Sequence, residues 1–245
     1  MSTRRASRRG AVASMVQPPS LTVVNSFVQK STGSAYSGSL VLTPGWTTTP
    51  GNSLLVIFAI QGGTSTACSS PACPSMSAAF SREPASFSFE GTFVGYGDVT
   101  AAATTVTITL HPTGQTRNWV ARIYELSGLR SGLTMISPNT MSSQVASSTP
   151  AMPNLSGAYG DLAVSTYNVT GNSTTEDITP SSTMNTLGGT TWQTDKDHNN
   201  NLFGGSYGSL NMFTGFSISP TPQTLGMSLS LAASRSYVGT SVLLG

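Results

Sequence analysis

The sequence predicts an all-β sandwich, and three observations support that prediction. Hydrophobic residues make up 38% of the chain and charged residues only 8%. The remainder is rich in Ser, Thr and Gly, a composition that suits strands and turns better than helices. No segment carries apolar residues at helical spacing over three turns. The second half of the chain also repeats the strand pattern of the first half in the same order.

Four apolar segments of the first half have a counterpart in the second half. The pairs are Gly51–Ile60 with Gly160–Tyr167, Phe93–Tyr96 with Phe213–Phe216, Val106–Leu110 with Met227–Leu231, and Trp119–Leu126 with Tyr237–Leu244. We expect half-repeats at about 20–130 and 155–245 that form one sandwich together. Each half has too few strands in this pattern to bury both faces of its own sheet.

Taken in order, residues 1–19 form a flexible basic arm that ends at Pro18-Pro19. Residues 20–245 form a single sandwich domain that begins with a strand over Leu21–Val28. Leu54–Ile60 is apolar at every position, which predicts a central strand covered on both faces.

Later segments show the alternation typical of strands with one buried face. Val106–Leu110 alternates apolar residues with threonines, and Met227–Leu231 alternates them with serines. The region Leu133–Asn154 has little periodicity, which predicts an extended connection between the two halves.

Positive charge is concentrated at the N-terminus, where four of the eleven basic residues lie. They are Arg4, Arg5, Arg8 and Arg9. These guanidinium groups can neutralise the phosphates of a packaged nucleic acid. Alternatively, the arm lies along a neighbouring subunit and pairs with carboxylates or carbonyls there. A third interpretation is a solvated tail.

The rest of the chain is poor in charge, with 7 Lys and Arg against 9 Asp and Glu. Such a surface has little repulsion between copies and tolerates dense assembly, although a secreted Ser/Thr-rich protein has a similar composition. The stretch Gly10–Val16 after the arginines is too short and too weakly apolar for an export signal. No stretch is long enough to cross a bilayer, so we expect no membrane partner.

Few residues in the chain are suited to catalysis or cofactor binding. Cys68 and Cys73 are too few for a structural zinc site, and they either form a local disulfide or remain free thiols. His111 and His198 lie in turn-like sequence without a neighbouring nucleophile and carboxylate. We therefore predict a protein without enzymatic activity or cofactor.

One segment resembles the first part of a calcium-binding loop. Asp195, Asp197 and Asn199 place oxygen side chains at alternate positions. The expected glycine is Asn200, and the expected bidentate acid is Ser206. These residues are thus a weak cation candidate, and a solvated hairpin loop is the favoured interpretation.

Four aromatic residues lie in predicted loops with Gly-rich or polar neighbours: Trp46, Trp192, Phe203 and Tyr207. Exposed aromatic rings of this kind can stack on sugars, but aromatics near strand ends more often close the ends of a sandwich core. Trp119 differs because it begins an apolar strand, which predicts a core position.

The succession of strands resembles a known type of module. The segments that carry the resemblance are Pro50–Ile57, Thr104–Leu110, Arg122–Gly128, Gly160–Val164 and Ser241–Gly245. Together they are similar to the jelly-roll-type sandwich modules of phage virion proteins, from minor tails or head surfaces, and of actinobacterial surface proteins. The resemblance covers residues 20–245, depends on strand spacing and brings no catalytic residues.

This resemblance implies a structural protein of a tailed-phage-like virion, assembled in the host cytoplasm. The chain would be a head decoration, a minor capsid subunit or a minor tail component. Its expected partners are major capsid or tail subunits and further copies of itself, with nucleic acid contacted only through the arm. The alternative is a carbohydrate-binding module or adhesin that recognises a cell-surface glycan. A third interpretation is a coat protein that forms the shell itself.

Overall fold

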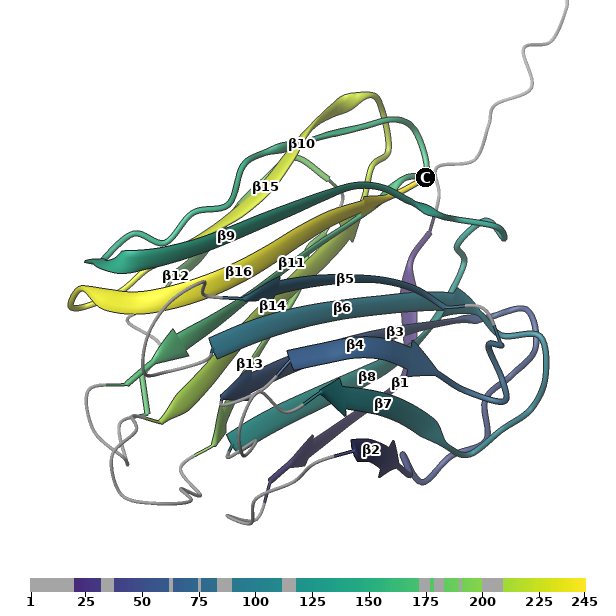
Figure 1. Cartoon of the computed structure of the whole chain (residues 1–245). Coiled ribbons are helices and arrows are strands. Elements are labelled where there is room, and N and C mark those ends of the chain that lie inside the picture. Colours follow the sequence, from purple (N-terminus) through teal and green to yellow (C-terminus); the bar gives the residue numbers. More distant parts are fainter. Residues whose placement is uncertain are drawn as a thin grey trace, which may run out of the picture.

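The computed structural model describes residues 20–31, 38–61, 64–74, 76–82, 90–111, 118–171, 177–178, 183–189, 191–199 and 209–245. These residues form sixteen strands in four antiparallel sheets, and no helix occurs among them. Figure 1 shows the strands arranged in layers. The prediction of an all-β sandwich is confirmed.

The first half of the chain supplies β1 (Thr22–Lys30), β2 (Gly38–Leu42), β3 (Ser53–Gln61), β4 (Thr64–Ser69), β5 (Ser77–Arg82), β6 (Glu90–Asp98), β7 (Val106–His111) and β8 (Asn118–Ser127). The second half supplies β9 (Met135–Ser147), β10 (Leu155–Gly157), β11 (Leu162–Thr170), β12 (Thr183–Leu187), β13 (Gln193–Asn199), β14 (Leu210–Ile218), β15 (Gln223–Ser230) and β16 (Arg235–Leu244).

The two halves have the same strand order. The first half forms a five-stranded sheet, β1-β8-β3-β6-β5, and a three-stranded sheet, β2-β7-β4. The second half forms β9-β16-β11-β14-β13 and β10-β15-β12. We call the five-stranded sheets the first and second large sheets. The segment pairs found in the sequence coincide with β3 and β11, β6 and β14, β7 and β15, and β8 and β16, so the predicted repeat is confirmed.

Burial along the strands follows the sequence pattern. Every residue of β3 is buried, as its continuous apolar run predicts. On β7, Val106 and Ile108 are buried, whereas Thr107 and Thr109 between them are partly exposed. This difference arises because successive side chains of a strand point to opposite faces of the sheet.

Each half is a sandwich by itself, which corrects the expectation that both halves form one sandwich together. The two sheets of the first half enclose a cluster that includes Leu54 and Ile108. Those of the second half enclose clusters that include Tyr167 and Leu229. The strands of each half were undercounted because β2, β4, β10 and β12 have only three to six residues and no clear apolar run.

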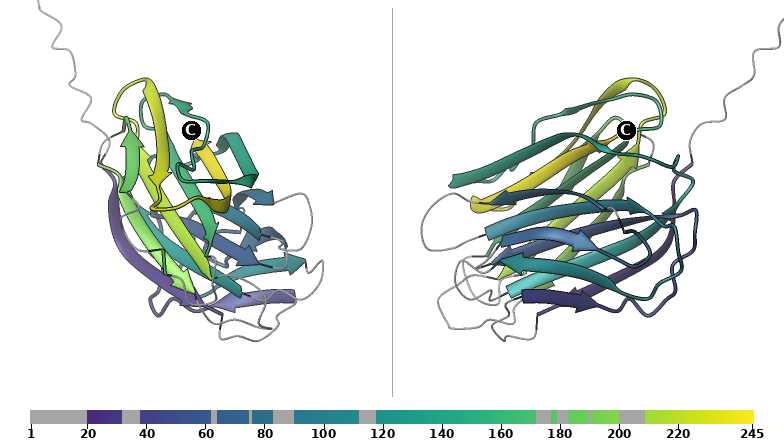
Figure 2. Two further views of the ribbon diagram at one scale, coloured as in Figure 1. Left: turned by 90° about the vertical axis from the view of Figure 1, so that its left-hand side faces the viewer. Right: turned by 45° about the vertical axis from the view of Figure 1, so that its right-hand side comes forward.

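A further apolar cluster fills the space between the two large sheets and joins the halves. It includes Leu55, Ile57, Val94, Tyr96, Val120, Leu126, Leu162, Val164, Met212, Phe216, Val242 and Leu244. The molecule is therefore a stack of four sheets, small, large, large and small, which Figure 2 shows from two further directions.

The halves face each other as the subunits of a two-fold dimer would. Strands β5 and β6 lie over β9 and β16, whereas β8 and β3 lie over β13 and β14. Apart from the contact of β5 with β9, these contacts are matched when the halves are exchanged, because β13, β14, β16 and β11 are the counterparts of β5, β6, β8 and β3. An isologous two-fold interface has this property.

The boundary between the halves lies earlier than predicted. The segment at 133–154 was expected to be a connection, but Met135–Ser147 forms β9 and pairs with β16 along its length. The connection is the shorter stretch 128–134, in which Gly128 and Gly132 adopt φ angles of 84° and 75°. Backbone pairing defines β9, an edge strand, so its side chains lack the periodicity that would have predicted it.

Candidate functional site

The interface between the two large sheets contains a charged cluster. Arg122 on β8 donates from Nε to Asp197 Oδ2 at 2.6 Å and from Nη2 to Asp197 Oδ1 at 2.8 Å. Its Nη1 lies 3.4 Å from Asp195 Oδ1. Tyr124 donates its hydroxyl to Asp195 Oδ2 at 2.6 Å. The cluster thus ties β8 of the first half to β13 of the second half.

The alternation of side chains along both strands produces this geometry. Arg122 and Tyr124 are two positions apart on β8, as Asp195 and Asp197 are on β13, so each pair points to one face. Arg122 and Asp197 are 14% and 5% exposed. Burial alone would lower the pKa of Arg122, but its hydrogen bonds with Asp197 raise it instead. Burial, followed by the bond to Asp195, raises the pKa of Tyr124.

The predicted loop around Asp195 is therefore a strand, and its carboxylates are mostly buried. The Arg122 guanidinium contacts the two carboxylates that the sequence suggested as ligands of a bound cation. The Asn199 amide donates to Ser31 Oγ at 2.9 Å and to the Trp119 carbonyl at 3.0 Å. Within the described ranges, no group of three or more His, Cys, Asp or Glu residues is placed to hold a metal ion.

A set of uncharged polar side chains is buried farther along the same interface. Thr92 on β6 and Thr240 on β16 share a hydrogen bond of 2.7 Å between their hydroxyl oxygens. Thr170 donates to the Glu90 carboxylate, which again joins the two halves. Thr166 is fully buried, and its hydroxyl has no hydrogen-bond partner among the described residues. Polar contacts thus help to fix how the halves are aligned.

A second carboxylate is held inside the first half. Glu125 accepts hydrogen bonds from Asn52 Nδ2 at 2.7 Å, from Asn25 Nδ2 at 2.8 Å and from the Thr49 backbone N–H at 2.8 Å. Burial alone would raise the pKa of Glu125, but these hydrogen bonds lower it overall. The carboxylate therefore fastens β1 and the turn before β3 to β8.

Cys68 and Cys73 are both buried and are free thiols, so the candidate disulfide is absent from the structure. Burial raises the pKa of each thiol to about 12. Because the thiolate is the reactive form, neither cysteine is poised as a nucleophile.

Two of the four candidate glycan-facing aromatics lie in the described residues, and both pack against the cores. Trp46 packs edge-on against Phe27, with ring centroids 6.2 Å apart, beside the core of the first half. Trp192 contacts the cores of the second half and donates Nε1 to the Gly188 carbonyl at 2.8 Å. Trp119 stacks on Phe58 and is 5% exposed, which confirms its predicted core position.

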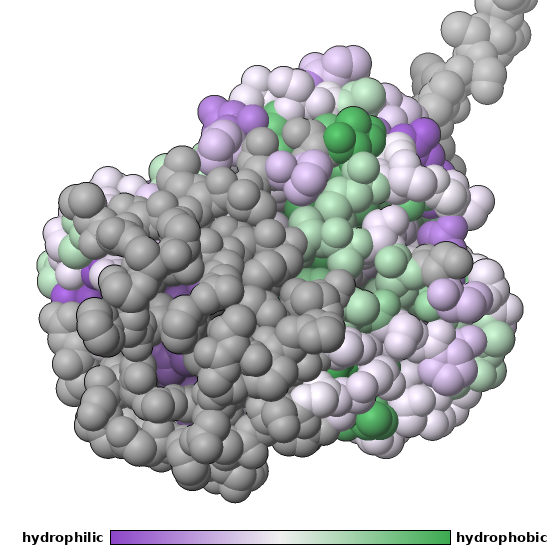
Figure 3. Space-filling view, in the orientation of Figure 1, coloured by the Kyte–Doolittle hydropathy of each residue, from purple (hydrophilic) through white to green (hydrophobic). Residues whose placement is uncertain are grey.

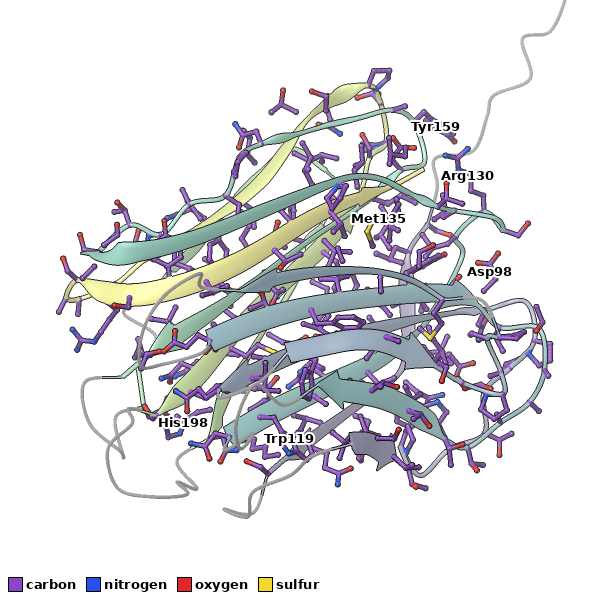
Figure 4. All side chains as sticks on the ribbon, viewed as in Figure 1. Asp98, Trp119, Arg130, Met135, Tyr159 and His198 are labelled. Atoms are coloured by element: carbon purple, nitrogen blue, oxygen red, sulfur yellow. The ribbon has the colours of Figure 1, made fainter. Side chains whose placement is uncertain are left out.

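The other candidates lie outside the described residues, namely Phe203, Tyr207 and the four arginines of residues 1–19. His198, predicted in a turn, lies instead on β13. Figure 4 shows His198 and Trp119 at one end of the molecule, and Arg130 and Tyr159 at the opposite end near the C-terminus.

Sequence analysis did not identify Arg122 and Tyr124 as interface residues. The available signal was an arginine at an inward-facing position of the apolar strand Trp119–Leu126. A buried arginine requires an acidic partner. The spaced acids Asp195 and Asp197 supply that partner.

No family model, no curated protein and no solved structure matches this chain. Among the described residues, no helix is long and apolar enough to cross a membrane.

Proposed function

We propose that this protein is a non-enzymatic structural component of a tailed-phage-like virion. It would act as a head decoration, minor capsid subunit or minor tail component through contacts with major capsid or tail subunits. The observation that carries the proposal is the duplicated sandwich. It makes a body of four open sheets, each of which ends in edge strands, and edge strands are the elements to which another chain can add.

We also propose that each half is a jelly roll. That fold arises when a long hairpin of four strand pairs, first with eighth through fourth with fifth, wraps into two sheets. The first three of these pairs are β1 with β8, β2 with β7 and β3 with β6. The second half repeats them as β9 with β16, β10 with β15 and β11 with β14. The fourth pair is replaced, because β5 and β13 join the large sheets beside β6 and β14.

The surface supports an assembly role as well. Figure 3 shows a described surface of mostly weakly polar residues with few strongly hydrophilic ones. Most of the acids described above are engaged in contacts inside the fold instead of facing solvent. Little electrostatic repulsion then opposes close packing of copies.

The test is the copy number of this chain in purified particles, measured by quantitative mass spectrometry against the most abundant co-purifying protein. A fixed ratio to a shell or tail protein is expected, with a high ratio for a head component and a low ratio for a tail component. A soluble monomer found only outside particles would refute the proposal. Binding of that monomer to a cell-surface glycan array would then favour the adhesin alternative.

A further inference from the structure

Strand β1 lies at the edge of the first large sheet, beyond the area that the second large sheet covers. Ser26 and Val28 pair with Tyr124 and Arg122 of β8, and directly opposite residues point to the same face. The second large sheet covers the two residues of β8, whereas Ser26 is exposed and Val28 is 38% exposed. The second large sheet therefore ends one strand short.

The strand at which the second large sheet ends is β13, and no other strand in the described part of the chain is added at its outer side. A pocket of about 260 Å³ opens where β1 and β13 begin; it is lined by Leu21, Thr22, Val23, Thr191, Gln193 and Phe216. We call the β13 edge, this pocket and the exposed face of Ser26 and Val28 the β1–β13 ledge. An edge strand beside a partly apolar pocket is a template for strand addition.

A strand added at β13 would complete the cover of β1, and the chain contains a segment of suitable composition. Residues Gly10–Gln17 carry no charge and are about as long as β13, which has 7 residues. Val12, Ser14 and Val16 alternate with Ala11, Ala13 and Met15, so an extended conformation would place the two valines on one face. Valine favours strands, and methionine fills irregular apolar pockets.

We propose that residues 10–17 of a second copy of this chain dock on the β1–β13 ledge as an added strand. The sequence between this segment and β1 favours a second copy over the same chain. Gln17 precedes Pro18-Pro19, and prolines restrict themselves and the preceding residue to extended conformations. A sharp reversal onto the chain's own β13 is thereby disfavoured. The inference concerns contact between copies and holds whether or not the particle is a virion.

Cross-linking between two different chains, each with one introduced cysteine, tests the proposal. One chain carries Gln193→Cys, and the other carries Val12→Cys, Ser14→Cys or Val16→Cys, three positions that cover different registers. Mild oxidation of equal mixtures should give a disulfide-linked heterodimer with at least one of them. The native thiols are buried and do not compete. Ala78→Cys, exposed on the edge strand β5, replaces Gln193→Cys as the control and should give at least tenfold less heterodimer.

Deletion of residues 1–19 gives a second measurement. The shortened chain should still fold, because the apolar clusters all lie within residues 20–245. Light scattering should show a lower oligomeric state for the shortened chain, with an unchanged circular dichroism spectrum. Three results would overturn the proposal: equal cross-linking to Ala78→Cys, no heterodimer at any position, or an unchanged oligomeric state after deletion. Cross-linking only within one chain that carries both cysteines would assign the ledge to the chain's own segment and overturn it too.

Discussion

Replacing Arg122 by methionine should weaken the contact between the two sandwiches more than the loss of an exposed ion pair would. The substitution leaves the carboxylates of Asp197 and Asp195 without their cation, and these side chains are 5% and 24% exposed. Breaking a buried pair costs about 3–5 kcal/mol, and the partial exposure of Asp195 places this cost near 3 kcal/mol. For a chain of this size, Tm should fall by about 6–12 °C.

Thermal and urea denaturation followed by circular dichroism measure this cost. The matched control is Arg130→Met, since Arg130 also pairs with a buried carboxylate, Asp161, at 3.0 Å, but is itself 55% exposed. An exposed pair of that kind contributes below about 1 kcal/mol. The control should therefore lower Tm by a few degrees at most.

A triple variant distinguishes the uncompensated charges from lost packing. Arg122→Met combined with Asp195→Asn and Asp197→Asn removes all three charges, and neutral groups are less costly to bury. Most of the lost stability should return. If the single variant loses no more than Arg130→Met, or if the triple variant recovers nothing, the charged cluster does not hold the halves together.

Four further predictions concern other buried groups. Thr166→Val removes a buried hydroxyl that has no partner among the described residues, so the free energy of unfolding should rise by about 1 kcal/mol. Thr92→Val breaks the bond to Thr240 and should lower it by a similar amount in the same urea titration. The folded pKa of Glu125 lies below its unfolded value of about 4.3. Its contribution is thus present above that pH and is lost as the pH falls through the folded pKa. Glu125→Gln should flatten this acid loss in denaturation series from pH 7 to pH 3, and an unchanged slope would contradict the assignment. Cys68 and Cys73 should resist an aromatic disulfide reagent at pH 8, and both should react after denaturation. Fast reaction of the folded protein, or no free thiol after denaturation, would show that the cysteines are exposed or oxidised.

The amino-acid pattern predicted the strands that form the centre of each large sheet. Leu54–Ile60 and Trp119–Leu126 are long and apolar, and each has a counterpart in the second half. Such strands are recognisable because burial on both faces requires apolar side chains at nearly every position. The repeat itself was visible for the same reason.

Most of the short and edge strands were not predicted. Strand β1 and the middle strands of the three-stranded sheets, β7 and β15, were recognised, but β9 was mistaken for a connection, β13 for a loop, and the other strands of the three-stranded sheets were missed. One exposed face and few residues leave little constraint on the side chains of such strands, so backbone pairing alone defines them. Because these strands were missed, the sequence did not predict the number of layers or that each half forms a sandwich by itself.

The sequence by itself determined that this is an all-β protein built from a repeat, because alternating and continuous apolar runs directly encode which faces are buried. Only the tertiary structure decided that the repeats are separate sandwiches packed through their large sheets. It alone brought Arg122 to Asp197 across 75 positions of sequence. The alternation of side chains along a strand sets the face to which a residue points. Which strand lies across from that face depends on how the sheets pack.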